Sequence, residues 1–225
     1  MKNLLLKSAF KFLQLPIMLA LFVFLPAGTF DYWQGWVFSG VFTLCSLIVT
    51  AYLAITDPKL LERRLDAGPR AEKEPTQKVI MAFAMICFAA LVIVSALDHR
   101  FGWSDVPTSV VLAGNLLIVL SFAAVTRVMR ENTFSASTIQ IAEDHKVIST
   151  GPYAHVRHPM YSGALLMLIG FPLALGSWWG LLLLIPTIGG IVWRLLDEEQ
   201  FLKKNLPGYT DYTQKVRYRL LPGIW

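Results

Sequence analysis

The sequence contains little charge and little cysteine. Asp, Glu, Lys and Arg make up only 16% of its 225 residues and hydrophobic residues make up 55%, whereas a soluble domain averages about 25% charged residues. This composition favours an integral membrane protein over a soluble domain with a large core. The two cysteines, Cys45 and Cys87, lie in apolar stretches and are typical of packing residues. We therefore expect neither a disulfide nor a cysteine-ligated metal site.

Motifs for binding metals, dinucleotides and nucleic acids are also missing. The chain has four histidines, and no further histidine or cysteine is placed to complete a metal site with His155 and His158. The segment "GPYAHVRH" is not a dinucleotide fingerprint, and the chain has no glycine-rich phosphate loop. Basic loops beside membrane spans explain the net charge of +5. We expect no metal and no nucleic-acid partner.

Long apolar segments dominate the rest of the sequence. A span needs about 20 apolar residues to cross the hydrocarbon core, and six segments have this length or come close to it. The last two are short, contain several glycines and prolines, and follow each other closely, so they predict a tight helical hairpin. We expect an all-α, polytopic integral membrane protein with about five to six spans. The segments are 12–29, 33–55, 79–97, 107–126, 161–176 and 178–193.

The basic residues are distributed unevenly among the loops. Of the 20 lysines and arginines, all except Arg100 lie before the first segment, between the second and third, between the fourth and fifth, or from Arg194 onward. The positive-inside rule places such regions in the cytoplasm. We therefore predict that both termini and the loops 56–78 and 127–160 are cytoplasmic, which requires an even number of crossings.

The chain divides into N-terminal transmembrane helices (1–126) and a second part (127–225) with a long loop, the hairpin and a C-terminal tail. In the first part, Asp57 caps a short helix with Pro58 in its first turn. We interpret it as a linker helix at the level of the lipid headgroups. The loop that opens the second part is rich in hydrogen-bonding side chains, and loops of such length are commonly functional. Basic and aromatic residues mixed in the tail predict an amphipathic interfacial segment.

Two polar clusters flank the predicted hairpin. The residues "RHP" come directly before it, and Arg194 and "DEE" come directly after it. An antiparallel hairpin returns its second end close to its first. We therefore expect the clusters to face each other on the cytoplasmic side, with a cavity between His158 and Glu199. Charged groups at a membrane boundary are costly unless they are paired or functional, so mutual salt bridges are the alternative explanation.

A site of this kind would offer carboxylates, histidines and aromatic rings. Carboxylates can hold an ammonium group, and aromatic faces can hold a sulfonium group. S-adenosylmethionine carries both of these cations. The polar clusters are therefore compatible with this cofactor.

The stretches "HKVISTGPYAHVRHPMYSG" and "DEEQFLKKNLPGYTDY" resemble the isoprenylcysteine carboxyl methyltransferase family, within the wider group of phospholipid-methyltransferase-like membrane enzymes. The similarity covers roughly residues 131–225, and its combined pattern of Gly-Pro-Tyr, Arg-His-Pro-x-Tyr-x-Gly, Glu-Glu and Tyr-x-x-Tyr is specific. It implies a methyltransferase that binds S-adenosylmethionine in a cytosolic pocket capped by the C-terminal region. The second part of the chain would then be the catalytic region, with a cofactor-binding loop.

The resemblance also implies roles for individual residues. Glu199, with Glu198, would bind the methionyl ammonium, and Arg194 would meet the carboxylate of the acceptor. His158, Tyr161 and Arg194 are the candidate catalytic residues, with His158 or a glutamate as the base if the acceptor is an amine or a thiol. Gln140, His145, Lys146, Val147 and Ile148 would line the adenosine side, and Tyr153, His158, Pro159, Met160 and Tyr161 would surround the cofactor near its sulfur.

We therefore predict a membrane methyltransferase that moves the methyl group of S-adenosylmethionine to a lipophilic acceptor. The acceptor would be a carboxylate, as in isoprenylcysteine O-methylation, or another small amphipathic acid, amine or thiol. Its expected partners are a lipophilic or lipidated substrate and membrane lipids. Two other interpretations stay open, a sterol-reductase-like enzyme that uses NADPH and a non-enzymatic membrane protein that binds lipid or a partner. The intact "RHPMYSG" and the Glu-Glu pair favour the methyltransferase.

Overall fold

The computed structural model describes residues 2–65, 67–72, 74–135, 137–138 and 146–225, and this part is helical and without strands. The predicted all-α fold is confirmed. Helix α1 (Lys2–Leu19) continues through a π-helical turn (Ala20–Phe24) into α2 (Leu25–Ala27). The helices that follow are α3 (Trp33–Thr56), α4 (Pro58–Leu65), α5 (Pro75–Phe101), α6 (Thr108–Glu131), α7 (Pro159–Ala174), α8 (Leu184–Asn205) and α9 (Tyr209–Lys215), with 3-10 turns at Gly151–Ala154 and Trp179–Leu183.

The six predicted apolar segments all form helices. Helix α7 is apolar but has only 16 residues, and it forms the predicted hairpin with α8. The composition and length of the other helices make the chain a polytopic integral membrane protein. Within the described residues, five stretches are long and apolar enough to cross a membrane: Phe10–Ala27, Trp33–Thr56, Pro75–Phe101, Thr108–Glu131 and Trp179–Asn205.

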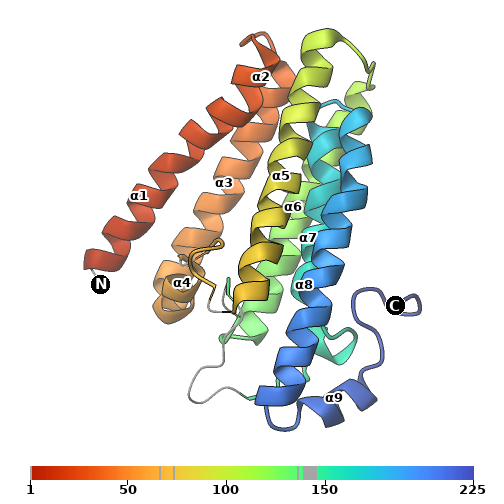
Figure 1. Ribbon diagram of the computed structural model, residues 1–225. Coiled ribbons are helices and arrows are strands. Elements are labelled where there is room, and N and C mark those ends of the chain that lie inside the picture. The colour runs from red at the N-terminus through yellow and green to blue at the C-terminus, as the bar shows by residue number, and fades with distance from the viewer. Residues whose placement is uncertain (1, 66, 73, 136, 139–145) are drawn as a thin grey trace.

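The long helices run side by side and alternate in direction (Figure 1). Helices α4 and α9, the connection between α6 and α7, and the N-terminus lie toward one end of the bundle, and the C-terminal tail folds back beside that end. The last turn of α5, which carries Arg100, lies at the opposite end. The regions that contain most of the basic residues therefore lie at one end of the molecule, and Arg100 lies at the other. That the basic end faces the cytoplasm stays a prediction.

Labelling of introduced cysteines should locate this basic end in the cytoplasm. In a protein with Cys45 and Cys87 replaced by alanine, Lys204→Cys at the end of α8 and Asp105→Cys between α5 and α6 are a matched pair of exposed positions. We expect a membrane-impermeant maleimide to label Asp105→Cys in intact cells, and Lys204→Cys only after the inner face has been exposed. The reverse pattern would contradict the predicted orientation.

Helix α7 packs closely against α6 through small residues. A Cβ added at Gly114 would lie 2.4 Å from the backbone nitrogen of Ala174, and one at Gly170 would lie 2.8 Å from the carbonyl oxygen of Gly114. Small residues allow this close approach, which is common between helices in membranes. The Ser121 hydroxyl also donates a 2.7 Å hydrogen bond to the carbonyl of Gly163. Helix α6 thereby fixes α7 and the "RHP" segment at its start.

Helix α4 packs with its apolar side against the bundle. As predicted, Asp57 caps it, and its Oδ1 accepts a 3.0 Å hydrogen bond from the backbone nitrogen of Leu60. Leu60 and Leu61 are buried against side chains of α3 and α6. The Ser137 hydroxyl donates to the carbonyl of Arg64 at 3.0 Å. The last turn of α4 is therefore fixed beside the loop that follows α6.

Candidate functional site

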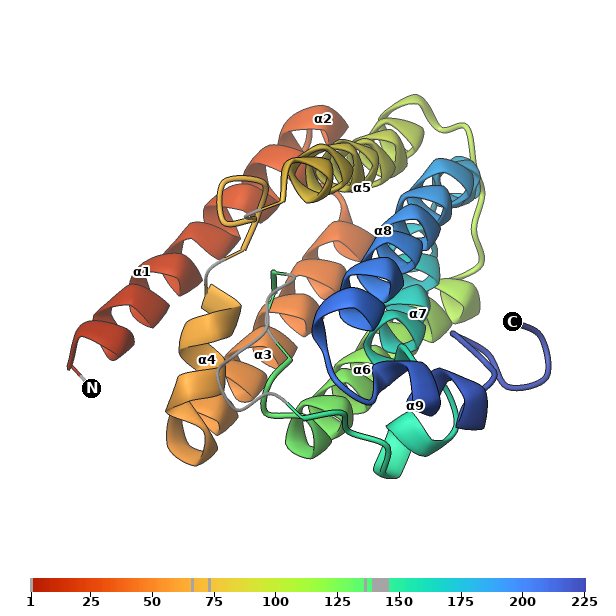
Figure 2. The same cartoon turned by 60° about the horizontal axis from the view of Figure 1, so that its bottom comes forward.

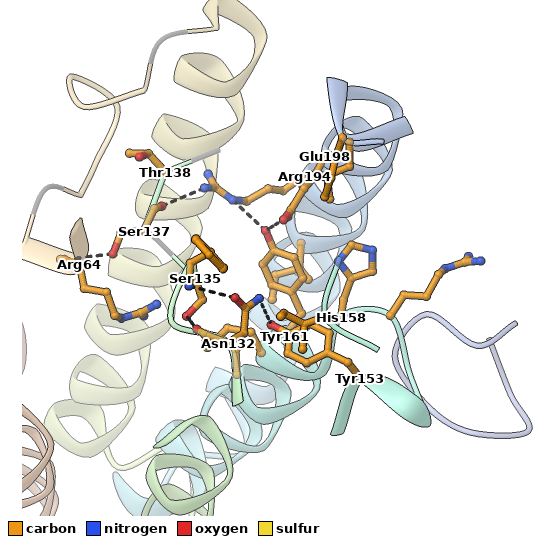
Figure 3. A pocket seen from close by; sticks show the side chains of 18 of the residues that line it. Arg64, Asn132, Ser135, Ser137, Thr138, Tyr153, His158, Tyr161, Arg194 and Glu198 are labelled. Atoms are coloured by element: carbon orange, nitrogen blue, oxygen red, sulfur yellow. Dashed lines mark hydrogen bonds between the residues drawn. The ribbon is translucent and has the colours of Figure 1, made fainter. Parts of the chain in front are cut away.

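A cavity of about 600 Å³ lies among helices α4, α5, α7, α8 and α9 and the segments on both sides of residues 139–145. Figure 2 brings this end of the bundle forward, and Figure 3 shows the cavity from close by. Its volume falls within the range of roughly 300–1,000 Å³ found for small-molecule sites. The wall combines apolar side chains from the membrane-spanning helices with polar side chains from the helix ends and loops.

The hairpin of α7 and α8 brings three polar side chains together at this cavity. Tyr161 lies in the first turn of α7, and Arg194 and Glu198 lie about one turn apart on α8. The Tyr161 hydroxyl donates a 2.7 Å hydrogen bond to Glu198 Oε2 and accepts one of 3.0 Å from Arg194 Nε (Figure 3). The prediction that the polar clusters meet across the hairpin is confirmed.

Arg194 has further partners that occupy its guanidinium. Its Nη2 lies 2.8 Å from Oε1 of Glu72, whose side chain is 1% exposed, and 3.0 Å from the carbonyl oxygen of Ser137. Glu72 lies between α4 and α5, and the sequence analysis did not identify it. A buried carboxylate balances the charge of a buried arginine that it contacts. Arg194 therefore holds Tyr161 in place, and its charge is already matched before any acceptor carboxylate arrives.

Glu199 does not line the cavity. Its buried carboxylate lies 2.7 Å from Arg157 Nε, 3.2 Å from His158 Nε2 and 3.2 Å from Arg219 Nε. The expectation of a cavity between His158 and Glu199 is therefore wrong, because the two side chains touch. Consecutive residues of an α-helix point about 100° apart. Glu198 can thus face the cavity while Glu199 faces the "RHP" segment and the C-terminal tail.

Asn132 and Tyr153 form a second hydrogen-bonded pair at the cavity. Asn132 Nδ2 donates to the Tyr153 hydroxyl at 3.0 Å, and its Oδ1 accepts from the backbone nitrogen of Phe134 at 3.0 Å. Burial raises the pKa of Tyr153 to about 12, although the hydrogen bond from Asn132 lowers it. Tyr153 is therefore protonated at neutral pH and can donate to a ligand. The motif pattern predicted Tyr153 at the site, whereas Asn132, which caps the end of α6, lies outside these motifs.

The C-terminal tail covers one side of the cavity. Tyr209 and Tyr212 of α9 line it, and the Tyr212 hydroxyl donates to the carbonyl of Tyr153 at 2.8 Å. Beyond α9 the tail runs beside the "RHP" segment, where the His158 backbone nitrogen donates to the carbonyl of Arg219 at 2.9 Å. The tail, which the sequence predicts as an interfacial segment, thus also holds the start of α7.

Most of the residues predicted to bind the cofactor gather around this one cavity. Pro159 begins α7 but does not line the cavity, and Gln140 and His145 lie outside the described residues. That the gathered residues bind a cofactor stays a prediction. Those that line the cavity are Lys146, Val147, Ile148, Tyr153, His158, Met160, Tyr161 and Glu198.

Residues 109–207 match the family model of the phospholipid methyltransferases. The match runs from the start of α6 through the loop and the hairpin to just beyond α8, and so includes most of the cavity wall. Over these residues the chain is similar to the phospholipid methyltransferases, and the match covers less than half of the chain. A comparison with curated proteins found no match. This similarity favours methyl transfer as the reaction class.

Proposed function

We propose that the chain uses S-adenosylmethionine to methylate a lipophilic acceptor, most readily a carboxylate. The observation that carries this proposal is the cavity beside Glu198, where a carboxylate, several tyrosine rings and an apolar wall face one space. The family supplies the reaction class. The membrane-spanning helices around the cavity supply a setting in which a lipophilic acceptor is available.

The residues around the cavity fit this cofactor. Glu198 presents a carboxylate that takes part in none of the ion pairs found among the described residues, so it can bind the methionyl ammonium. The rings of Tyr153, Tyr161 and Tyr209 line the same space, and aromatic faces attract a sulfonium. The segment 146–148 offers backbone groups to the adenosine.

When bound, S-adenosylmethionine would supply the methyl group. The bond between this carbon and sulfur would break as the carbon bonds to the acceptor oxygen, and the products would be S-adenosylhomocysteine and a methyl ester. The protein's part is to align the acceptor with that methyl group and to exclude water. Arg194 and Tyr161 hold the Glu198 side chain in one position through their hydrogen bonds of 3.0 and 2.7 Å. The α9 tyrosines cover the site.

The position of His158 favours a carboxylate acceptor. An amine or a thiol would need a base, for which His158 and a glutamate are the candidates. In this proposal Glu198 already binds the ammonium. The Nε2 of His158 lies 3.2 Å from Glu199, which does not line the cavity. A carboxylate is already ionised at neutral pH and needs no base.

The lipophilic part of the acceptor would lie on the apolar side of the cavity. Met81 and Met85 of α5, Ala164 of α7 and Ile191 of α8 line that side, and α5 and α8 are membrane-spanning. Methionine side chains adapt to varied apolar shapes. The acceptor can therefore approach from the membrane while the cofactor approaches from the loops.

Titration calorimetry on the purified protein tests the choice of cofactor. We expect saturable binding of S-adenosylmethionine and S-adenosylhomocysteine and no binding of NADPH. A preference for NADPH would indicate a reductase. Binding of none of the three would contradict an enzyme of either kind and favour a protein that binds only lipid or a partner.

A further inference from the structure

Arg64 is a cation of the cavity wall that pairs with no carboxylate of the described residues. The lysines and arginines that line the cavity are Arg64, Lys146, Arg157 and Arg194. Arg157 and Arg194 each pair with a buried glutamate, at 2.7 and 2.8 Å, and Lys146 is exposed. Over the part of the chain that the structure describes, no ion pair includes Arg64.

The fold holds Arg64 at this position. Its helix is fixed by the burial of Leu60 and Leu61, and its own carbonyl accepts the hydrogen bond from Ser137. In Figure 3 the Arg64 side chain extends inward on the side of the cavity away from Glu198. Burial lowers the pKa of Arg64, and Tyr153 partly offsets this effect. A buried charge without a partner is unfavourable, so an anion that reached it would be bound favourably.

We propose that Arg64 binds the anionic group of the methyl acceptor, either a carboxylate or a lipid phosphate. This inference rests on the proposed function and names the acceptor's chemical class. A guanidinium can form two parallel hydrogen bonds with either group, and the geometry of these bonds gives specificity as well as affinity. Met81 and Met85 line the same cavity and suit the apolar part of such an acceptor.

The cofactor's own carboxylate does not suit Arg64. It is bonded to the same carbon as the ammonium, so a cofactor whose ammonium lies at Glu198 also has its carboxylate near Glu198. Arg64 lies on the other side of the cavity (Figure 3). The anion at Arg64 must therefore come from a second ligand, and the acceptor is the second ligand that the reaction requires.

Recognition by Arg64 would also separate substrate from product if the acceptor is a carboxylic acid. O-methylation turns the carboxylate into a neutral ester, which can no longer form a charge-assisted pair with a guanidinium. The ester should therefore bind more weakly than the acid, which helps it to leave. A lipid phosphodiester methylated at another atom would keep its charge and its contact with Arg64.

The test measures binding and needs no turnover. Protein in detergent, saturated with S-adenosylhomocysteine, is titrated with N-acetyl-S-geranylcysteine, with the methyl ester of that acid, and with dihexanoylphosphatidylethanolamine. We expect Arg64→Gln to weaken the binding of one anionic probe by about 10- to 100-fold and to leave the ester and S-adenosylhomocysteine unaffected. A loss for the acid identifies a carboxylate acceptor, and a loss for the phospholipid identifies a phosphate.

Three results would overturn the role of Arg64. In the first, the wild-type protein binds neither anionic probe more tightly than the ester. In the second, the Arg64→Gln variant binds every probe as the wild type does. In the third, Arg64→Gln binds S-adenosylhomocysteine more weakly than the wild type does. The last result would place Arg64 at the cofactor. If the wild type does not bind S-adenosylhomocysteine at all, the cofactor proposal fails, and the same titrations without it still decide the role of Arg64.

Two further variants control for charge and folding. Lys59→Gln removes a positive charge from an exposed position of the same helix, and we expect it to bind all probes as the wild type does. An equal loss in Lys59→Gln would indicate general electrostatic attraction and overturn the proposal. Arg64→Lys keeps the charge without the planar donors, and we expect intermediate binding of the anionic probe. It replaces Arg64→Gln in the test if that variant does not fold.

Discussion

Replacing Glu198 by glutamine should lower the affinity for S-adenosylhomocysteine by about 10- to 100-fold, because a hydrogen bond to a charged group contributes about 1.5–3 kcal/mol. This ligand keeps the ammonium of the cofactor and lacks the sulfonium charge, so the loss reports on the ammonium contact. Glutamine has the same shape as glutamate and can still accept the hydrogen bond from Tyr161, seen at 2.7 Å. The variant should therefore fold normally. Titration calorimetry on both proteins gives the two dissociation constants.

Glu199→Gln is the matched control for this prediction. It makes the same chemical change at the neighbouring residue, which does not line the cavity. We expect the folded Glu199→Gln protein to bind S-adenosylhomocysteine with the wild-type dissociation constant. Equal constants for the wild type and Glu198→Gln would remove Glu198 from the site. A loss confined to Glu199→Gln would return the ammonium to the residue that the sequence analysis assigned to it.

The arrangement of charges explains how one cavity can suit two ligands of opposite sign. Buried glutamates already match Arg157 and Arg194, at 2.7 and 2.8 Å. Among the described residues of the wall, the charged side chains that belong to no ion pair are Glu198, Arg64 and the exposed Lys146, and Glu198 and Arg64 lie on opposite sides (Figure 3). A cationic cofactor and an anionic acceptor would each meet the opposite charge there. The same arrangement would keep the two ligands in a fixed mutual orientation, which is the main contribution an enzyme makes to a methyl transfer.

The fold could be predicted from the sequence because its main determinants are local. Segment length and hydropathy determine where the membrane-spanning helices form. The cap of α4 is also local, because Asp57 Oδ1 accepts its hydrogen bond from the backbone nitrogen of Leu60, three residues further on. The short connection between the fifth and sixth apolar segments predicted the hairpin of α7 and α8. The partners of α4 could not be predicted, because they lie in α3 and α6 and the contact with α6 is distant in sequence.

The candidate site could be predicted only in part. The motif residues Tyr153, Tyr161 and Glu198 do line the cavity, since the hairpin brings its two ends together. The choice between Glu198 and Glu199 depends on the rotation of α8 about its axis, which the apolar pattern near a helix end does not define. Arg64 lies outside the segment that resembles known methyltransferases, and only the tertiary packing of α4 brings it to the cavity.

Replacing Glu199 by glutamine should destabilise the protein by about 3 kcal/mol, because removing one member of a buried ion pair leaves its partners uncompensated. Glu199 contacts the guanidinium groups of Arg157 and Arg219 at 2.7 and 3.2 Å and the His158 imidazole at 3.2 Å. We expect a value at the lower end of the range for such losses, since the side chain of Arg219 is 28% exposed. Those three residues connect the "RHP" segment, α8 and the C-terminal tail, so the loss should loosen the covered side of the cavity first.

Thermal unfolding in detergent measures this effect. For a chain of this size, about 3 kcal/mol corresponds to a decrease of roughly 6–12 °C in the midpoint temperature. Glu198→Gln serves as the control and should unfold close to the wild-type temperature, because Glu198 belongs to no ion pair within the described residues. The pair of variants should therefore show opposite patterns, with Glu198→Gln stable but weak in binding and Glu199→Gln normal in binding but less stable. A Glu199→Gln protein that unfolds at the wild-type temperature would show that the contacts of Glu199 with Arg157, His158 and Arg219 contribute little to the fold.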